Sequence, residues 1–238
     1  MKSISDICFI VQARLNSERV PKKMIRNFVG TTLTDQVIEK LVTSNLIPNN
    51  QIYLSAYEPE LKSIGNKYPI NVFNRSYESA NVDCGIKTLF EWYNKLPYEY
   101  VVMVSGCNPF LKIKTIESFI KTYLSSPYDG LFSVIEKKNY FWNQKGNMLN
   151  GWPEGQDLLN TKEVESTYEA AHCLYGSKMD LIGKGKWVGD WNKKNDPVLF
   201  KVEEMEAFDI DYEWQFVLAE NLFKLNDIDH SIVLNSYQ

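Results

Sequence analysis

The sequence predicts an α/β protein with a three-layer, mostly parallel sheet and a small antiparallel excursion. Short runs such as residues 7–11 are continuously apolar, as expected of parallel strands that are covered on both faces. Segments with helical spacing follow these runs up to about residue 123, which indicates strand–helix units joined by right-handed crossovers. After Pro127 strands follow one another without helices between them. This second region predicts the antiparallel excursion.

The predicted elements alternate along the chain. Apolar runs predict strands at 7–11, 51–55, 70–73, 100–104, 130–136, 139–144, 170–175 and 198–202. Helical periodicity predicts helices at 33–41, 59–67, 82–94, 114–123 and 212–225. Either Thr32 or Thr34 is the expected N-cap of the first helix. The strand at 139–144 is expected to pair antiparallel with 130–136, and residues 146–162, rich in Gly, Asn and Pro, are expected to be irregular.

The composition limits the class of protein. The chain has 238 residues, of which 44% are hydrophobic, with a formal net charge of −4 and a pI near 5.4. This length suits a single domain, residues 1–238, and the acidic balance gives no general positive field for nucleic acid or an anionic membrane. No apolar run approaches the roughly 18 residues that a membrane span needs. We therefore expect a cytoplasmic protein whose partners are small molecules.

The cysteines are widely scattered, at Cys8, Cys84, Cys107 and Cys173. They form no C-x-x-C pair, and the sequence contains only 2 histidines. A zinc site needs closely spaced soft ligands, so the spacing argues against one. Free thiols in a reducing compartment are the expected state.

A basic loop follows the first predicted strand. Residues 12–23 contain the cations Arg14, Arg19, Lys22 and Lys23. Ligands of open α/β sheets bind beyond the carboxyl ends of the strands, and guanidinium groups with backbone N–H dipoles can hold a polyphosphate there. The loop lacks the Gly-Lys-Ser/Thr of a P-loop and the G-x-G-x-x-G of a dinucleotide site. On composition alone, a phosphate-binding loop and a solvated basic turn remain equally acceptable.

The order of residues in this loop resembles one known family. The matching residues are Val11, Gln12, Ala13, Arg14, Ser17, Arg19, Pro21 and Lys23. They resemble the signature loop of the cytidylyltransferases that activate sialic acid and KDO, including the spore-coat polysaccharide branch with Gln before Ala-Arg. The resemblance implies a nucleotide-diphospho-sugar transferase-like, Rossmann-like fold. It also implies that the loop binds the triphosphate, through Ala13, Arg14, Asn16, Ser17, Arg19 and Lys23. Leu15-Asn16 replaces the usual glycine-rich centre.

Two further segments extend the resemblance. Residues 74–83 resemble the family loop that reads the cytosine, which implies base contacts from Arg75, Ser79 and Asn81. Ser79 or Asn81 could equally cap the helix that follows. Residues 104–111 resemble the segment that shapes the catalytic centre, with Ser105 as a nucleotide contact and Asn108 as an acceptor contact. Cys107 stands near the position of an aspartate metal ligand of the KDO enzymes, which weakens an assignment to KDO.

A pair of carboxylates precedes the last predicted helix. Asp209 and Asp211 are two residues apart, so in an extended segment both side chains point to one side. Oxygen ligands of this kind suit Mg²⁺, which bridges carboxylates and phosphates. An isolated D-x-D before a helix is more often a cap, but the segment resembles the family's Asp-Ile-Asp motif. We therefore predict a Mg²⁺ site at Asp209 and Asp211, with Arg14 and Lys23 completing the catalytic set.

Residues 139–200 carry the least specific part of the resemblance. Their family counterpart binds the sugar and contributes to a dimer, which implies a homodimer and an acceptor site near Glu169, His172 and Tyr175. A single histidine beside an apolar strand is more often structural. The residues therefore remain candidates for the acceptor site.

Together these features predict transfer of CMP from CTP to an acidic sugar, with release of pyrophosphate. A sialic, legionaminic, pseudaminic or KDO-like acid, or a related acceptor, would serve the biosynthesis of surface glycans. One alternative is a nucleotide-sugar-dependent glycosyltransferase, although that class would place its Asp-x-Asp in mid-chain. The other is a non-catalytic nucleotide-binding relative, which the altered loop centre would allow.

Overall fold

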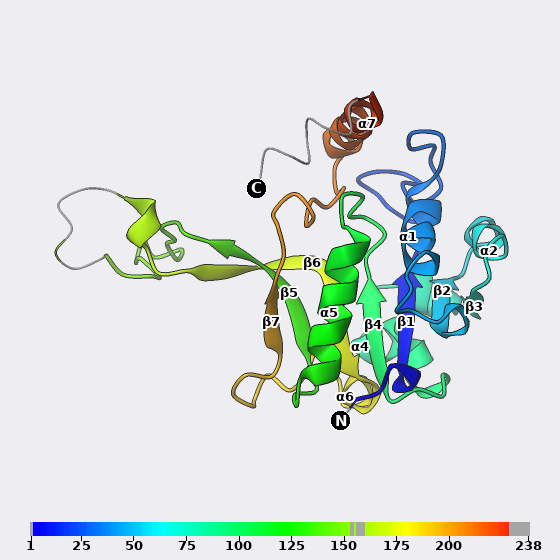
Figure 1. Ribbon diagram of the computed structural model, residues 1–238, viewed down its shortest axis with the longest axis horizontal. Helices are drawn as coiled ribbons and strands as arrows, with labels where there is room; N and C mark the ends of the chain where they lie inside the picture. Colours follow the sequence, from blue (N-terminus) through cyan, green and yellow to red (C-terminus); the bar gives the residue numbers. More distant parts are fainter. Residues whose placement is uncertain (1, 153–154, 156–159, 229–238) are drawn as a thin grey trace.

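The computed structural model describes residues 2–152, 155 and 160–228. The described part forms a seven-stranded sheet in the order β3-β2-β1-β4-β6-β5-β7 (Figure 1). Its strands are β1 (Ile7–Gln12), β2 (Ile52–Ala56), β3 (Asn71–Asn74), β4 (Tyr100–Val104), β5 (Leu131–Lys137), β6 (Thr167–Lys178) and β7 (Val198–Lys201). Parallel pairs join β1 to β2 and β4, β2 to β3, and β5 to β7, which confirms the predicted class of sheet.

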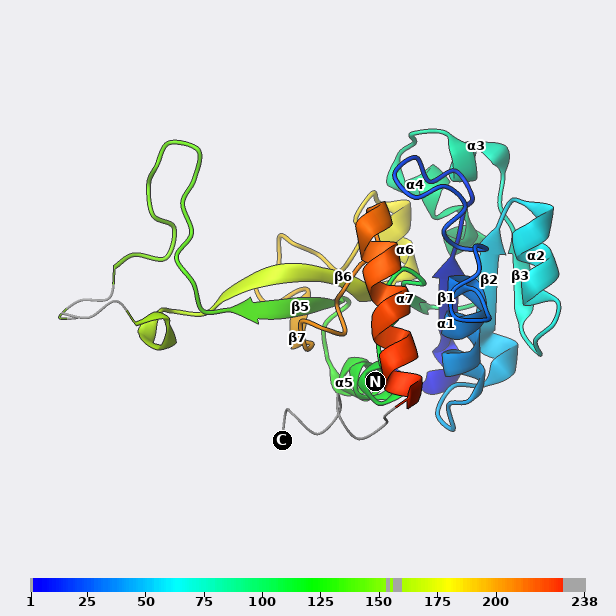
Figure 2. The ribbon, with the colours of Figure 1, turned by 90° about the horizontal axis from the view of Figure 1, so that it is seen from above.

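Helices cover both faces of the sheet, so the predicted three layers are present (Figure 2). The α-helices are α1 (Leu33–Val42), α2 (Pro59–Gly65), α3 (Tyr77–Asn81), α4 (Ile86–Leu89), α5 (Ile113–Ser125), α6 (Met179–Gly183) and α7 (Glu213–Ile228). Short 3₁₀ turns are η1 (Ile4–Asp6), η2 (Asn49–Gln51), η3 (Glu91–Asn94) and η4 (Thr161–Glu163). No helix in the described part of the chain has the length and apolar character needed to cross a membrane.

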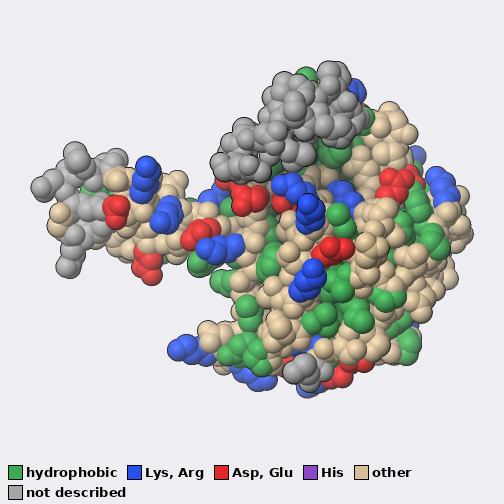
Figure 3. Space-filling model, in the orientation of Figure 1, with side chains coloured by type: hydrophobic (Ala, Val, Ile, Leu, Met, Phe, Trp, Pro, Cys, Tyr) green, Lys and Arg blue, Asp and Glu red, His purple; other side chains and the backbone are tan. Residues whose placement is uncertain are grey.

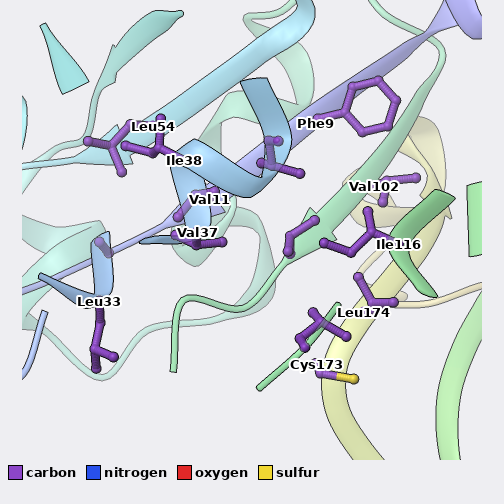
Figure 4. Close-up of a cluster of buried hydrophobic side chains, with 14 of the residues drawn as sticks. Phe9, Val11, Leu33, Val37, Ile38, Leu54, Val102, Ile116, Cys173 and Leu174 are labelled. Atoms are coloured by element: carbon purple, nitrogen blue, oxygen red, sulfur yellow. The ribbon is translucent and has the colours of Figure 1, made fainter. Parts of the chain in front are cut away.

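The central strand β1 supplies both hydrophobic clusters of the protein. Its alternate residues point to opposite faces: Phe9 and Val11 join the larger cluster, while Cys8 and Ile10 join the smaller one. The larger cluster unites β1, β2 and β4 with the apolar sides of α1 and α5 (Figure 4). Full burial of each large apolar side chain stabilises the fold by about 1.5–3 kcal/mol. This burial on two sides fixes β1 in place, and with it the start of the basic loop.

The antiparallel part of the sheet is larger and more central than the sequence predicted. Strand β6 lies between β4 and β5 and runs antiparallel to both. Its inner half is buried, whereas its outer half, near Tyr168 and Glu169, is exposed. The predicted strand at 139–144 is wrong: this segment makes one isolated bridge, between Trp142 and Met148. The side chain of Asn143 accepts from Lys145 N and from Asn147 N, and so stabilises a turn instead.

The predicted helix at 82–94 is also wrong. Within these residues the structure forms only the short helix α4 and the turn η3, with Gly85 as the extended N-cap of α4 and Phe90 outside the helical region at φ −110° and ψ 41°. Neither Ser79 nor Asn81 is a cap, because the side chain of Ser76 accepts from Ser79 N. The cap of α1 is Thr32, whose hydroxyl accepts from Asp35 N at 3.0 Å.

The region at 139–200 divides into two parts. The outer ends of β5 and β6 continue into an arm, residues 138–152, 155 and 160–166, that stands away from the body (Figures 1 and 3). Of the predicted irregular segment 146–162, residues 153–154 and 156–159 lie outside the described residues. Residues 179–197 instead return to the body, where the ring of Trp187 lies 4.6 Å from that of Tyr175.

A close backbone approach fixes this returning segment against β5. A Cβ added to Gly130 would lie 2.5 Å from Gly189 Cα, and Gly130 N donates to Asp196 Oδ1 at 2.8 Å. Gly130→Ala should therefore destabilise the protein by about 1–3 kcal/mol, the usual result of overpacking, with thermal unfolding as the measurement. Gly85→Ala is the control, because nothing lies within 4 Å of its added Cβ. Equal melting temperatures for the two variants would contradict this packing.

Candidate active site

The basic loop is anchored at both ends. Ala13 N donates to Ser55 O at 3.0 Å, which continues the β1–β2 pairing by one residue, and Leu15 N donates to Glu58 Oε1 at 2.9 Å. Further along, the side chain of Val20 is fully buried. The polar and basic residues between these anchors face outward at the carboxyl end of β1. The conformation of the loop is therefore fixed by contacts with the body of the protein, unlike that of a solvated turn.

The segment that carries the two aspartates is held between the β1 loop and the β4–α5 turn. Ile210 N donates to Cys107 O at 3.0 Å, and Asn108 Nδ2 donates to Ala207 O at 3.1 Å. From the other side, Lys23 Nζ donates to Ile210 O. Both Asn108 and Lys23 are largely buried, so these bonds are protected from water. The predicted acceptor contact Asn108 thus positions the aspartate segment and does not line the cavities described below.

Asp211 faces the cations of the loop. Its Oδ1 lies 2.8 Å from Arg19 Nη2 and 3.6 Å from Lys23 Nζ. The guanidinium of Arg19 also lies over the ring of Tyr212, with Cζ 5.2 Å from the centroid. Because Arg19 and Asp211 are partly exposed, their attraction is screened by water and contributes little to stability. The pair is free to exchange partners when an anion or a cation arrives.

Asp209 occupies a different environment. Its Oδ1 is buried without a hydrogen-bond partner among the described residues. Burial raises the pKa of this carboxyl, while the nearby Lys23 acts in the opposite direction. An unpaired buried carboxylate is unfavourable unless a cation or a donor compensates it. The described residues hold no group of three or more His, Cys, Asp or Glu that could bind a metal alone, but two carboxylates are enough for Mg²⁺ that keeps waters and binds phosphate. The pair fits such an ion.

A cavity of about 570 Å³ lies between the loop and Asp211. This size suits a small-molecule site. Among the predicted residues it brings together Ala13, Arg14, Asn16, Ser17, Arg19, Lys23, Asn81 and Asp211. It is also lined by residues that the sequence did not single out as site residues: Gln12, Glu18, Met24, Asp83 and Cys107. Burial raises the pKa of the Cys107 thiol, so this side chain is neutral at pH 7 and does not substitute for an aspartate ligand.

A second, adjoining cavity extends from Arg14 to Arg75 and Leu89. Arg75 is buried, and its guanidinium donates to Ala13 O at 3.1 Å, to Ser79 Oγ at 3.1 Å and to Ser79 O. Burial lowers its pKa to about 10, so it stays charged. In this state Arg75 fixes the start of the basic loop. The predicted base contacts of Arg75, Ser79 and Asn81 stay predictions.

A third cavity adjoins the first at the carboxyl ends of β1 and β4, and its wall is largely aromatic. Its rings come from Phe90, His172, Tyr175 and Trp187, and it also reaches Ser105, Asp209 and Asp211. His172 Nδ1 lies 3.1 Å from the Tyr175 hydroxyl, and His172 has a positive φ of 53°, which is uncommon for a residue with a side chain. The predicted residue Glu169 lies elsewhere, in an ion pair with Lys137 at 3.6 Å.

Comparison with known proteins identifies the family. Residues 8–177 match the family described as Cytidylyltransferase. The chain belongs to the cytidylyltransferase family. The resemblance carried by the basic loop is thereby confirmed. The match includes the basic loop and ends before the aspartate segment at 207–211.

Individual relatives are distant. The chain is 24% identical to N-acylneuraminate cytidylyltransferase A of Danio rerio over 87% of its own length and 49% of the relative. It is 22% identical to pseudaminic acid cytidylyltransferase of Campylobacter jejuni subsp. jejuni, over 94% and 98% of the two chains. It spans about half the length of the curated relatives that it matches first. A solved CMP:2-keto-3-deoxy-manno-octonic acid synthetase complexed with CTP has the same fold, with a TM-score of 0.66 and 11% identity over 93% and 100% of the chains.

The environment of Asp209 gives a prediction about stability. A carboxyl whose pKa is raised by folding opposes folding once it is ionised, so its cost appears as the pH rises above the unfolded value near 3.8 and is complete above the folded pKa. Asp209→Asn removes this charge while keeping the shape. We expect the variant to melt at a higher temperature than the natural protein at pH 7, with a smaller difference near pH 4. A lower melting temperature at pH 7 would contradict the view that the ionised carboxylate of Asp209, with its unpaired Oδ1, opposes folding.

Proposed function

We propose that this member of the cytidylyltransferase family transfers CMP from CTP to an acidic sugar, with release of pyrophosphate, in the synthesis of surface glycans. The observation that carries the proposal is the arrangement of the first cavity: three loop cations, Arg14, Arg19 and Lys23, line it together with Asp211, whose carboxylate pairs with Arg19 and Lys23. A triphosphate needs the cations, and its divalent ion needs the carboxylate. The family membership supports CTP as the nucleotide.

In this proposal the loop holds the leaving group. The guanidinium groups of Arg14 and Arg19 bind the outer phosphates, and the ammonium of Lys23 lies deeper, toward the aspartate segment. Their positive charges offset the charge that the departing pyrophosphate gains as its bond to the α-phosphorus breaks. The anchors of the loop at Ser55 and Glu58 keep these groups in place before the substrate arrives.

Asp209 and Asp211 would hold Mg²⁺. The buried, unpaired Oδ1 of Asp209 and the exchangeable ion pairs of Asp211 suit such a ligand. When bound, Mg²⁺ supplies positive charge that stabilises the negative phosphate oxygens in the transition state. Arg19 and Lys23, which neutralise Asp211 in the free protein, become available for the phosphates at the same time.

The acceptor would bind in the aromatic cavity. This cavity shares Gln12, Arg19, Cys107 and Asp211 with the first cavity, which lies between the basic loop and Asp211 and is called the triphosphate cavity below. An acceptor in the aromatic cavity therefore lies next to the nucleotide. His172, Tyr175 and the indole N–H of Trp187 are polar groups of its aromatic wall. The names of the relatives, which include enzymes of N-acylneuraminate and pseudaminic acid, support an acidic sugar. The neutral thiol of Cys107, near the position that the resemblance assigns to an aspartate of the KDO enzymes, argues against KDO itself.

We also infer a homodimer and a cytoplasmic location. The arm exposes large apolar side chains, with Trp142, Leu149 and Trp152 each more than half exposed. Exposed groups of this kind are typical of interaction surfaces, and a second copy of the chain could cover them. The free thiols of Cys8, Cys84, Cys107 and Cys173 suit a reducing compartment.

The direct experiment mixes the protein with CTP, Mg²⁺ and a panel of sugar acids, and measures pyrophosphate and the CMP-sugar product. We expect both products with at least one acid, and neither when CTP is replaced by a nucleotide sugar. Transfer from a nucleotide sugar would indicate a glycosyltransferase instead. Nucleotide binding without turnover on any acid would indicate a non-catalytic relative.

Removal of Asp211 should abolish most turnover without unfolding the protein. Its side chain is partly exposed and contributes little to packing, whereas loss of an electrostatic group at the reacting centre typically costs about 10²–10³-fold in kcat. Steady-state pyrophosphate release by Asp211→Ala measures this effect. Glu213→Ala is the matched control, since Glu213 pairs with Arg26 at 2.7 Å and lines none of the three cavities. Turnover of Asp211→Ala near that of the control would refute the assigned role of this residue.

Removal of Arg14 should mainly weaken CTP binding. A charge-assisted hydrogen bond contributes about 1.5–3 kcal/mol, so Arg14→Ala should raise the KM for CTP by roughly tenfold or more. Lys22→Ala is the control: it removes a cation from the same loop at a position that lines none of the cavities. If both variants raise the KM equally, the loop acts only through its total charge.

A further inference from the structure

Gln12 lies where the three cavities meet. It is the only residue in the described part of the chain that lines the triphosphate cavity, the cavity beside Arg75 and the aromatic cavity. It ends β1, and its register partner Ser55 ends the paired stretch of β2. In the sequence Gln12 is part of the loop that resembles the family signature, but no contact with the substrate was assigned to it. Gln12 is a candidate site residue because it borders all three cavities.

The chemistry of the proposed reaction indicates which part of the substrate lies beside Gln12. The α-phosphorus of CTP is bonded to the nucleoside oxygen and to the departing pyrophosphate oxygen, and it receives the acceptor oxygen. Three subsites must therefore converge on that one atom. If the cavities hold the nucleoside, the triphosphate and the acceptor, as the proposed function requires, the side chain common to all three lies beside the α-phosphoryl group.

The carboxamide of Gln12 is held firmly in one orientation. Its Oε1 accepts from Trp92 Nε1 at 2.8 Å, and its Nε2 donates to Leu89 O at 3.2 Å. The same carbonyl of Leu89 accepts from Ser79 Oγ at 3.0 Å, and Ser79 in turn is bonded to the buried Arg75. Trp92 is fully buried. The indole N–H of Trp92 can only donate, so the atom that faces it is the amide oxygen of Gln12. The amide nitrogen therefore faces the carbonyl oxygen of Leu89.

One hydrogen of this amide has no partner among the described residues. A primary amide has two N–H donors, and the bond to Leu89 O uses one of them. Gln12 is only partly buried and borders all three cavities, so the second N–H is available to a ligand. A donor that is already oriented stabilises charge on a phosphate oxygen without reorganisation of the site.

We propose that Gln12 is a catalytic residue that donates a hydrogen bond to a non-bridging oxygen of the α-phosphate. The cations of the loop serve the outer phosphates, and Gln12 serves the phosphorus that is attacked. Its neutral donor stabilises the charge on the equatorial oxygens during transfer. It also orients the α-phosphate between the leaving pyrophosphate and the acceptor.

Binding of CMP and of cytidine tests this contact without knowledge of the acceptor. The two ligands differ only in the α-phosphate, so the ratio of their dissociation constants, measured by calorimetry, isolates it. Gln12→Met should reduce the CMP affinity by about tenfold, as expected for loss of a hydrogen bond to a charged group, and change the cytidine affinity little. Melting temperatures verify that the variants remain folded.

Gln12→Glu separates substrate contact from a structural role. Glutamate keeps an acceptor for Trp92 but lacks the donor and adds a negative charge, so its CMP affinity should fall at least as far as that of Gln12→Met. A role confined to holding Trp92 would give Gln12→Glu the natural CMP-to-cytidine ratio and would overturn the proposal. An unchanged ratio in Gln12→Met would overturn it too, while leaving the proposed function intact. Failure of the natural protein to bind CMP and CTP would overturn both.

Discussion

The geometry of the candidate site depends on the aspartate segment, residues 207–211, which is held between two loops at the carboxyl edge of the sheet. The β4–α5 turn holds it through Cys107 O and Asn108, and the β1 loop holds it through Lys23. The aspartate segment follows β7 at the far edge of the sheet, yet it places Asp209 and Asp211 beside the loop after the central strand β1. These few hydrogen bonds therefore assemble a site from segments almost two hundred residues apart.

Opposite electrostatic states of the two aspartates follow from this arrangement. Asp211 is partly exposed and forms ion pairs with Arg19 and Lys23, whereas Asp209 is half-buried, with a buried, unpaired Oδ1 and a raised pKa. The ion pairs of Asp211 contribute little to stability, and the unpaired oxygen of Asp209 is an unfavourable feature that a ligand or a proton relieves. A site that costs stability in the free state is expected where function requires the cost.

The sequence predicted the elements whose formation depends on local pattern. Buried parallel strands produce apolar runs, and the basic loop keeps its family order of residues, so β1, β4 and the loop were predictable. The break at Gly85 was not predicted, because the helical periodicity of residues 82–94 does not show that Gly85 adopts an extended conformation at φ −68° and ψ 160°. Gln12 was overlooked as a site residue because its orientation is set by Trp92, 80 residues away. The sequence placed the polar residue Asn108 in a segment of the site, but only the structure shows that its side chain donates a hydrogen bond to Ala207 O.

The most direct measurement is a crystal structure of the protein grown with CTP and Mn²⁺, in which anomalous scattering locates the metal. We predict that the triphosphate lies against Arg14, Arg19 and Lys23, and that the metal is bound to the carboxylates of Asp209 and Asp211 in place of the ion pair between Arg19 and Asp211. A triphosphate bound away from this loop, or a metal elsewhere with that ion pair intact, would contradict the central claim.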